Sequence, residues 1–500
     1  MKRFIWTLVA VVFAGGVSAQ QFADALRFSQ TDYSLTTARA AAMGGAYSSL
    51  GADLSAAGIN PAGLAMYRSS ELGFSPSMMF SRQESNYTNG DNARSSFDNR
   101  NRLLFNNFGV ATTSLYSGMG LKSSTFAVTL NRTIDHNSRM RVNGYSPFSL
   151  SEVLALDLNG IKTADISGGG SGEIYKAFYN NGMSLWPAIL GYQSYFVNPS
   201  ETADGEYYGA IENSVNQSLT ELSKGATLDG NFSLALNFNN ELYFGLTVGL
   251  VSIDYRNRLT YTENNISGSE SDVTSMSLSE YLNIEGSGVN FKVGAIYRPI
   301  PEWRLGISYH SPSFINMEES YMMRMQTTFN NGDWCDNDTP VSVNEYDLQT
   351  PSRLLLGTSF TIDKTVILSA DYERVWYNKI SMDHPIYDLK NDIFNEINAL
   401  GVRATNNYRF GGEAVLTRNV FLRMGYALYE SMFSGDSDDF RKENISLGMG
   451  FRNRDFSLDL AYIYSETKSS VYMYKTQSVL GQASNKLMKN FLTVSLGCRF

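Results

Sequence analysis

After its first nineteen residues the sequence lacks any long apolar run, and it contains few cysteines and histidines. A membrane-spanning helix needs about 20 consecutive apolar residues, so none is predicted in the rest of the chain. The two cysteines, Cys335 and Cys498, are too few for a disulfide scaffold. The chain also lacks a basic cluster and has a formal net charge of -9, which excludes nucleic acid as an expected partner.

The first residues have the pattern of a secretory signal peptide. Lys2 and Arg3 precede an apolar stretch from Phe4 to Ala14, and Val17-Ser18-Ala19 forms a small-residue cleavage site. We therefore predict a signal peptide at residues 1–19 and an exported mature protein.

Residues 20–66 have the pattern of neither a strand nor a long helix. Small residues dominate the stretch from Ala38 to Ala46, and Asn60-Pro61-Ala62 gives a turn signal near the end. Small side chains allow a backbone to pack closely against a surrounding wall. We predict that this N-terminal segment (residues 20–66) is a hatch inside a barrel.

From residue 67 onward, apolar and polar residues alternate. Clear runs include Phe232 to Phe238, Leu242 to Leu250 and Phe456 to Tyr464. A period of two is typical of a strand, and runs of about ten residues with one apolar face are typical of transmembrane strands. The fourteen runs predict that residues 67–500 form an all-β fold, a 14-stranded antiparallel transmembrane β-barrel.

The predicted connections alternate between short turns and long loops. The long loops include 83–102, 135–225, 262–286 and 316–350. Outer-membrane barrels have short periplasmic turns and long extracellular loops, whereas a soluble sandwich or propeller has no reason to sort its loops this way. We therefore predict a bacterial outer-membrane protein with the 135–225 insertion outside the cell.

The insertion at 135–225 is too long for an ordinary loop. The spacing of Ile211, Val215, Leu219 and Leu222 predicts a helix within it. Its many aromatic residues either pack a small core of the insertion or line a groove that captures a greasy ligand. Clustered aromatic side chains usually bury one another, which favours the packing interpretation.

If the apolar faces of the strands contact lipid, the opposite faces point into the lumen. Examples of residues in that phase are Gly294, Gly306, Gly425, Arg409 and Glu413. The charges need water or partners, and the glycines leave room for an inserted segment. Candidate charge partners in the N-terminal segment are Asp24, Arg27, Asp32, Arg39 and Asp53.

The last run ends in an aromatic residue, Phe500. Strands that close outer-membrane barrels resemble this end, and barrel assembly machinery reads such a signal. The alternative is that Phe500 is one more aromatic residue at the membrane interface. Its position at the end of the chain favours the assembly signal.

Several motifs resemble the FadL-type outer-membrane transporters of hydrophobic compounds. They are Ala46-Tyr47, Asn60-Pro61-Ala62-Gly63, Gly294 to Tyr297, Arg304 to Ser311 and Leu422 to Tyr426. The resemblance covers essentially the whole mature chain, and the Asn-Pro-Ala element is its most specific part. It implies a monomeric barrel, plugged by its amino-terminal segment, that passes long-chain fatty acids or similar molecules by diffusion. It also implies an opening in the wall near the third strand.

Four residues are candidate ligand-binding residues. Phe22, Leu26 and Phe28 offer an apolar face near the start of the mature chain, and the resemblance implies that this end reaches the ligand pocket. The competing interpretation is that Phe22 anchors the hatch against the wall. His310 could serve a phospholipase or ligate haem iron, but nothing orients its imidazole, which favours polar lining of the lumen.

The sequence therefore predicts passive uptake of hydrophobic compounds such as long-chain fatty acids, by a protein that is not an enzyme and needs no cofactor or metal. A structural or adhesive barrel and a haem uptake receptor are the alternatives. The predicted hatch favours the uptake hypothesis over the adhesive barrel, because adhesion gives no reason to fill the lumen. The expected partners are hydrophobic small molecules, outer-membrane lipid and, through Phe500, the assembly machinery.

Overall fold

The structure is a computed structural model that describes residues 17–89, 92–118, 120–167, 175–212, 214–266, 272–385, 388–434, 440–475 and 480–500. The predicted signal peptide at residues 1–19 lies outside these residues, except for its last three positions. In the described ranges, no helix is both long enough and apolar enough to span a bilayer.

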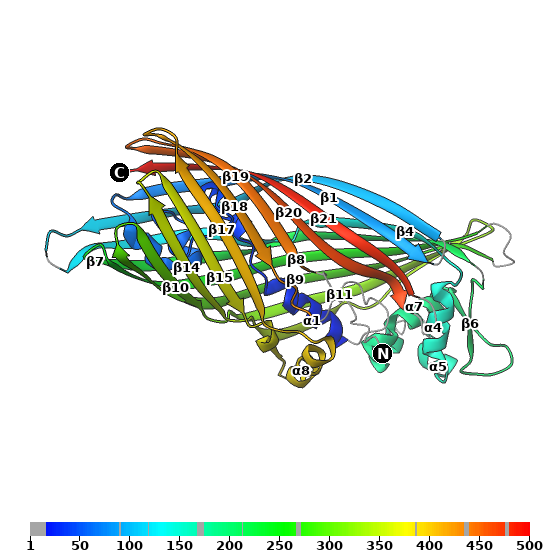
Figure 1. The fold of residues 1–500 in the computed structure, drawn as a ribbon. Coiled ribbons are helices and arrows are strands. Elements are labelled where there is room, and N and C mark those ends of the chain that lie inside the picture. The colour runs from blue at the N-terminus through cyan, green and yellow to red at the C-terminus, as the bar shows by residue number, and fades with distance from the viewer. Residues whose placement is uncertain are drawn as a thin grey trace.

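One sheet contains almost all of the strands (Figure 1). Its segments are β1 (Glu71–Asn89), β2 (Asn92–Leu115), β3 (Leu121–Asp135), β4 (Ser138–Ser146), β7 (Val215–Phe238), β8 (Leu242–Asn265), β9 (Val273–Ile300), β10 (Trp303–His310), β11 (Phe314–Phe329), β12 (Trp334–Asp338), β13 (Ser342–Gln349), β14 (Arg353–Ile362), β15 (Val366–Val375), β16 (Ser381–Asp383), β17 (Thr405–Val415), β18 (Val420–Tyr429), β19 (Lys442–Arg452), β20 (Phe456–Lys475) and β21 (Leu480–Arg499).

Short interruptions divide several wall strands into two or three of these segments. β4 continues β3 along β7, and β11 continues β10 along β9. β12, β13 and β14 follow β11 and β10 as one wall strand, and β16 extends β15. The wall therefore has fourteen antiparallel strands, and β21 pairs with β1 to close it. The predicted 14-stranded β-barrel is confirmed.

The outer face of the strands carries an apolar band. Leu246 and Leu447 are exposed on this face, whereas their neighbours Thr247 and Ser446 on the inner face are buried. Because the side chains of a strand alternate between its two faces, polar residues collect in the lumen and apolar ones face outward. Such a band is what contact with lipid requires.

The wall is much taller on one side than on the other. β7, β8 and β9 contain 24, 24 and 28 residues, whereas β14 and β15 contain 10 each. In Figure 1 the tall strands extend past the ends of the short ones towards the helices of the insertion. The interpretation of 83–102, 262–286 and 316–350 as loops is therefore largely wrong, because most of these residues are strand.

The insertion is shorter than the predicted 135–225. β4 extends the wall to Ser146, and β7 resumes it at Val215. The helix predicted from Ile211 to Leu222 is wrong, because residues 215–223 pair with β4 on one side and with β8 on the other. Between the two strands lie α4 (Leu150–Leu158), α5 (Thr163–Ile166), α6 (Lys176–Asn180), η3 (Met183–Leu185), α7 (Trp186–Gln193), β5 (Val197–Pro199) and β6 (Tyr207–Gly209).

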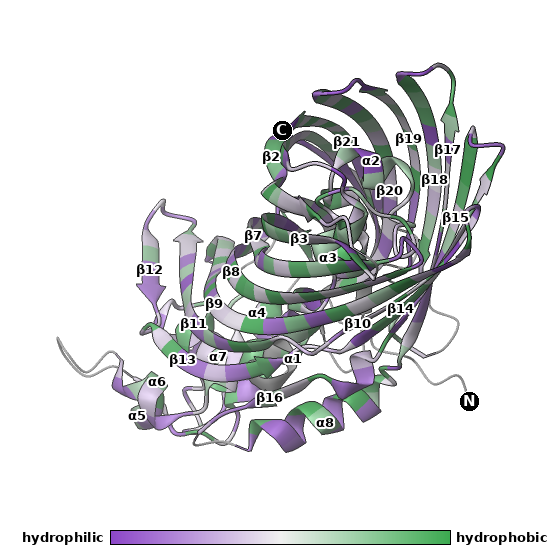
Figure 2. Cartoon of the chain, turned by 90° about the vertical axis from the view of Figure 1, so that its left-hand side faces the viewer, coloured by the Kyte–Doolittle hydropathy of each residue, from purple (hydrophilic) through white to green (hydrophobic). Residues whose placement is uncertain are grey.

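The N-terminal segment is made of short helices and turns. They are α1 (Val17–Phe28), η1 (Tyr33–Leu35), α2 (Ala38–Ala42), α3 (Ala56–Ile59) and η2 (Pro61–Met66). Figure 2 shows α2 and α3 surrounded by the strands, and nearly every residue from Tyr33 to Ala65 is buried. On the short side of the wall, α8 (Leu389–Leu400) contacts α1 and follows the short η4 (Tyr377–Lys379).

Candidate functional site

Inward-facing glycines of the wall lie directly against the backbone of the N-terminal segment. A β-carbon on Gly294 would lie 1.9 Å from Oδ1 of Asn60, and one on Gly425 would lie 2.1 Å from the nitrogen of Gly44. Similar overlaps with the segment would arise at Gly245, Gly306, Gly411 and Gly448. Any side chain at these positions would push the segment or the strand away. The prediction that lumen-facing glycines make room for an inserted segment is confirmed.

Asn60 holds the end of the segment against two strands. Its Oδ1 accepts a hydrogen bond from the nitrogen of Ala62 at 3.1 Å, which caps η2. Its Nδ2 donates to the carbonyl of Ser48 at 2.6 Å. The same amide lies 3.4 and 3.3 Å from the carbonyls of Ala295 in β9 and Ile307 in β10. The predicted Asn60-Pro61-Ala62 motif thus makes both a local turn and a contact with the wall.

A buried ionic network joins the segment to the short side of the wall. Arg39 Nε donates to Glu413 at 3.2 Å, and Arg423 Nε donates to the same carboxylate at 2.6 Å. Arg423 continues the network through Nη1 to Asp459 at 2.6 Å. These side chains are almost completely buried, so each charge depends on its partners rather than on water.

A second polar contact lies beside this network, on β15. Asp371 accepts hydrogen bonds from the backbone nitrogens of Tyr47 and Ser48 at 2.9 Å each, and from the Ser48 hydroxyl at 2.6 Å. The hydroxyl of Tyr33 donates to Glu373 on the same strand at 2.9 Å. The wall carboxylates therefore satisfy donors of the segment, which fixes its position in the lumen.

The other predicted charge partners differ in what they bind. Asp32 forms an ion pair with Lys442 of β19 at 2.6 Å, as the prediction requires. Asp24 and Arg27 pair with each other, and Asp53 accepts hydrogen bonds within the segment. None of these three residues pairs with a charge of the wall, because the segment itself supplies their hydrogen-bond and ion-pair partners. Arg27 does contact the wall, since its guanidinium lies over the ring of Tyr255 of β8, 4.5 Å from the centroid.

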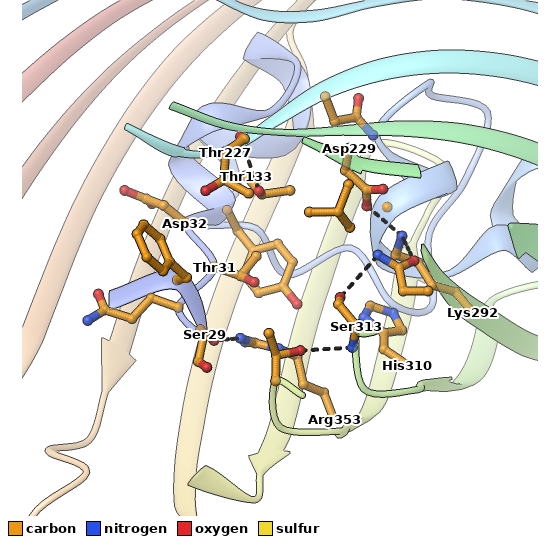
Figure 3. Close-up of a pocket in the computed structure, with 18 of the residues that line it drawn as sticks. Ser29, Thr31, Asp32, Thr133, Thr227, Asp229, Lys292, His310, Ser313 and Arg353 are labelled. Carbon is orange, nitrogen blue, oxygen red and sulfur yellow. Dashed lines mark hydrogen bonds and ion pairs between the residues drawn. The ribbon is translucent and has the colours of Figure 1, made fainter. Parts of the chain in front are cut away.

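A polar cavity of about 100 Å³ lies in the lumen where α1 ends (Figure 3). Residues 28–33 line one side, and the wall supplies Thr133, Asp229, Lys292 and His310. At about 30 Å³ per water molecule, the cavity can hold only a few waters. A long apolar molecule therefore needs the N-terminal segment or its neighbours to move before it can pass.

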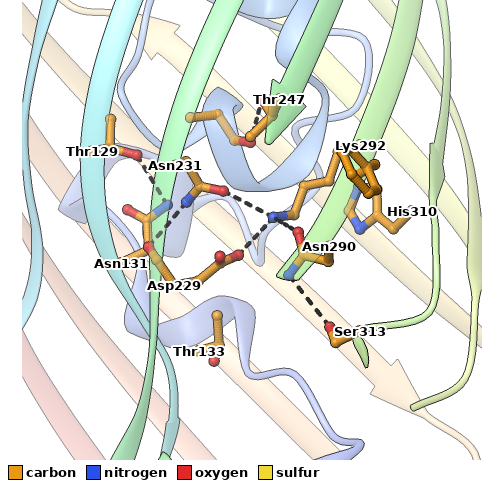
Figure 4. Close-up of polar contacts among 12 residues, drawn as sticks. Thr129, Asn131, Thr133, Asp229, Asn231, Thr247, Asn290, Lys292, His310 and Ser313 are labelled. Atoms are coloured by element: carbon orange, nitrogen blue, oxygen red, sulfur yellow. Dashed lines mark hydrogen bonds and ion pairs between the residues drawn. The ribbon is translucent and has the colours of Figure 1, made fainter. Parts of the chain in front are cut away.

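Lys292 has its charge satisfied by the wall itself (Figure 4). Its Nζ donates to Asp229 at 2.6 Å, to Asn231 at 2.8 Å and to Asn290 at 2.9 Å. An ammonium group has three donors, so this lysine has no hydrogen left for a ligand. Asn290 lies on the same strand as Lys292, whereas Asp229 and Asn231 come from β7, so only the folded wall brings these partners together.

His310 lies against the N-terminal segment at the edge of the cavity. Its Nε2 donates to the carbonyl of Ile59 at 2.9 Å, because a carbonyl oxygen can only accept. The hydroxyl of Ser308 donates to the carbonyl of Val293 at 3.3 Å. These bonds are what polar lining of the lumen requires, and they give the imidazole a structural partner.

The other three candidate ligand residues share one apolar cluster, and one of them also lines the cavity. Phe28 lines the polar cavity, and its ring makes edge contacts with His136 and Tyr255 at centroid distances of 5.4 and 5.6 Å. All three residues are buried in one large apolar cluster. The structure thus brings Phe28 and His310 to one cavity, and Phe28 connects that cavity to the cluster that contains Phe22 and Leu26.

Asp24 sits in this apolar environment with little access to water. Burial raises the pKa of Asp24 to about 6, because the loss of hydration outweighs the attraction of Arg27. Glu221 acts in the same direction as burial. The second half of α1 therefore carries a carboxyl group whose pKa is about 6.

The apolar cluster extends without interruption from α1 through the tall part of the wall to the insertion and α8. It is unusually rich in methionine. Its methionines are Met140, Met276, Met317, Met323, Met325, Met382, Met432 and Met473. Methionine side chains are flexible and adapt to ligands of different shape. Sequence reasoning missed those of β11 because it interpreted 316–350 as loop.

The wall has a seam between its second and third strands. The ladder of β2 with β3 ends at the pair Asn107 and Asn131. Beyond this pair, in the described residues, β4 has a ladder with β7 but none with β2. Side chains bridge the seam instead, including Arg139 Nε with Asp98 at 3.2 Å.

The insertion packs on the rim of the tall wall. Glu263 of β8 accepts hydrogen bonds from the hydroxyl of Ser149 at 2.6 Å and the nitrogen of Leu150 at 2.8 Å. Phe178 and Trp186 are buried with their rings in edge contact at 5.8 Å, as the packing interpretation requires. Some other aromatic residues of the insertion, among them Tyr179, remain exposed.

A closed wall of fourteen antiparallel strands, an exposed apolar band and a filled lumen define an outer-membrane β-barrel. The model of the family "Outer membrane protein transport protein (OMPP1/FadL/TodX)" matches residues 209–493, and the chain belongs to this family. The family consists of transport channels for hydrophobic compounds. The resemblance and the outer-membrane localisation predicted from the sequence are confirmed.

Solved structures share the fold at low sequence identity. The chain is 12% identical to the P. putida toluene transporter TodX, with a TM-score of 0.52. The structural alignment covers 94% of this chain and 99% of that one. The CymD monoaromatic hydrocarbon channel is also 12% identical, with a TM-score of 0.50 and the same coverage. A FadL homologue from Pseudomonas aeruginosa is 12% identical, with a TM-score of 0.50 and coverage of 93% and 98%. No curated protein sequence matches the chain.

Proposed function

We propose that this protein is a passive, monomeric channel for hydrophobic small molecules, with the N-terminal segment as its hatch. The observation that carries the proposal is the methionine-rich apolar cluster, which extends from the insertion to α1. A ligand that dissolves in this cluster gains the free energy of leaving water. It needs no energy source beyond its own concentration gradient.

The route has two barriers that the contacts identify. The first is α1, whose Phe22 and Leu26 fill part of the apolar cluster and must yield to a ligand. The second is the polar cavity, which leads towards the seam beside Asn131. Since the seam is bridged by side chains rather than by a backbone ladder, we place the lateral exit there. This agrees with the opening near the third strand that the resemblance implies.

Two substrate classes remain candidates. The sequence predicts long-chain fatty acids, whereas two of the similar solved structures are a toluene transporter and a monoaromatic hydrocarbon channel. Both classes bury mainly apolar surface, so the cluster suits either one. They differ in that a fatty acid brings a carboxylate head group, which needs a donor such as Arg27 in the last turn of α1.

The alternatives have less support. An adhesive or structural barrel gives no reason for the dense contacts between the N-terminal segment and the wall. A haem receptor needs an imidazole that is available to iron, whereas His310 Nε2 is engaged by Ile59. An esterase needs a serine beside the histidine, whereas Ser308 donates its hydroxyl to a backbone carbonyl. We therefore propose transport without catalysis.

Uptake by cells tests the proposal. Cells that express the protein should take up a radiolabelled long-chain fatty acid or toluene faster than cells with an empty vector. Purified protein in liposomes should release the same compounds down a gradient without an energy source. Equal rates with and without the protein for both compounds would contradict the proposal.

A further inference from the structure

Six cations lie on the outer surface of the wall just beyond the apolar band, on neighbouring strands. This basic sector consists of Arg132 of β3, Arg139 and Arg141 of β4, Lys224 of β7, and Arg256 and Arg258 of β8. Five of the six are exposed, and the residues that alternate with them, such as Met140, Ser223 and Tyr255, are buried. The five exposed cations therefore point away from the lumen, whereas Arg132 also borders the lumenal cavity.

Strand pairing places like charges beside one another in this sector. Lys224 lies directly opposite Arg256, and Leu222 lies between Arg139 on one side and Arg258 on the other. Directly opposite side chains are about 5 Å apart, and like charges at that distance destabilise a sheet. An anion that lies over the sector removes this repulsion.

The protein supplies only part of that negative charge. Arg132, Arg139 and Arg256 each have a carboxylate within 4.0 Å, at 3.7, 3.2 and 3.3 Å. In the part of the chain that the structure describes, Arg141 and Lys224 form no ion pair. Arg258 lies over the ring of Tyr281, 5.1 Å from its centroid, and also lacks a carboxylate partner there.

The neighbouring part of the outer surface has the opposite charge. Asp254, Glu285, Glu318 and Glu345 form one row across β8, β9, β11 and β13, in which each faces the next. All four are exposed. The basic sector therefore adjoins an acidic one on a chain whose net charge is -9, and a ligand of the basic sector must be an anion that approaches from that side.

The level of the sector identifies the source of that anion. Arg132 follows the exposed Leu130 of the apolar band by two residues, and Lys224 is four residues from the outward-facing Leu228. Four residues of strand span about 13 Å along the strand, which is the level of the lipid head groups. Guanidinium and ammonium groups bind phosphate through charge-assisted hydrogen bonds.

We propose that the basic sector binds the phosphate groups of outer-leaflet lipids, the phosphorylated glycolipids that face the outside of the cell. The lipid lies against the wall over β3, β4, β7 and β8, with its acyl chains on the apolar band and its phosphates between the cations. The proposal depends on the outer-membrane location of the barrel and not on what the channel transports.

Lipid that copurifies with the intact protein provides the test. The variant R139Q/R141Q/K224Q/R258Q removes charge from the sector, and the charge-conserving variant R139K/R141K/R258K retains it. K364Q/R418Q is the control, because both residues are exposed in turns at the opposite end of the wall. Each protein is extracted in mild detergent, checked for a heat-modifiable barrel and probed by native mass spectrometry with lipopolysaccharide and with dephosphorylated lipopolysaccharide.

The wild-type protein should retain lipopolysaccharide and release it on dephosphorylation. The glutamine variant should lose about fivefold in affinity for each cation removed, whereas the lysine variant and the control should match the wild type. Equal retention by the glutamine variant and the control would overturn the proposal. So would equal binding of the dephosphorylated lipid by the wild type.

Discussion

The side-chain oxygen of Asn60 occupies the space beside Gly294 in which a β-carbon would stand, only 1.9 Å from that position. The two residues are far apart in the sequence, and their contact joins the N-terminal segment to β9. The same amide group of Asn60 also bonds the carbonyl of Ser48 within the segment. A single side chain therefore couples the fold of the segment to its position in the lumen.

Gly294→Ala should loosen the N-terminal segment without opening the wall. The added methyl group must displace Asn60. Inserting a methyl group into a well-packed core costs about 1–3 kcal/mol of folding free energy. Proteolysis of residues 20–66 in the purified barrel should become faster, and the channel should leak small polar solutes. Gly118→Ala is the control, because a β-carbon there meets no atom within 4 Å. Unchanged proteolysis in Gly294→Ala would show that the contact does not hold the segment.

Arg423→Met should destabilise the folded barrel strongly. It leaves Glu413 and Asp459 without the guanidinium that both contact at 2.6 Å. Breaking a buried ion pair from one side costs about 3–5 kcal/mol. Denaturant unfolding followed by heat-modifiable migration measures the loss. The double variant R423M/D459N should recover part of it, and a double variant no more stable than R423M would contradict the coupling.

Docking of α1 should weaken as the pH rises from about 4 to about 6. The pKa of Asp24 is raised to about 6 when α1 is docked, so its stabilising contribution is complete at low pH and is lost as the carboxyl ionises. A shift of this size corresponds to about 3 kcal/mol. Hydrogen exchange of the amides of residues 22–28 reports the docking.

Asp24→Asn provides the matched comparison for that experiment. It keeps the shape of the side chain but removes the ionisation, so exchange in this variant should follow only the intrinsic pH dependence. The variant should also dock more tightly than the wild type at pH 7.5. Identical pH profiles in the two proteins would show that Asp24 does not control α1.

Phe22→Ala should strengthen binding of a fluorescent fatty acid by about tenfold, because the ligand gains the apolar space that the ring now fills. Phe22 is completely buried in the methionine-rich cluster. Leu156→Ala is the control, because Leu156 is 70% exposed on α4. Heat-modifiable migration should be the same in all three proteins. Unchanged affinity would leave Phe22 as an anchor of the segment alone.

Phe500→Ala should lower the amount of folded protein in the outer membrane. Phe500 is 72% exposed, and its backbone already pairs with Ser70 through two bonds of 3.1 Å. The ring is therefore free to act as an assembly signal without any role in packing. Leu416→Ala, at another exposed apolar position, controls for lost surface area. If both variants give the same amount of folded protein in the outer membrane, Phe500 is an interfacial aromatic residue and not an assembly signal.

The alternation of apolar and polar residues was enough to predict the barrel, its strand number and the phase that faces the lumen. This succeeds because the side chains of a strand alternate between two faces, and lipid demands an apolar face along the whole wall. The glycines of that phase also predicted an inserted segment, because glycine in a strand marks a site where another backbone approaches closely.

Tertiary structure alone decided where the strands end and which partners the charges find. Val215 and Leu219 match a helical period, yet they form strand because β4 and β8 satisfy the backbone on both sides. Asp24 was expected to bind the wall, yet it pairs with Arg27 in its own helix. The contact of Asn60 with Gly294 depends on strand register across the whole barrel. Local sequence cannot encode it, because it is made by residues that only the closed wall brings together.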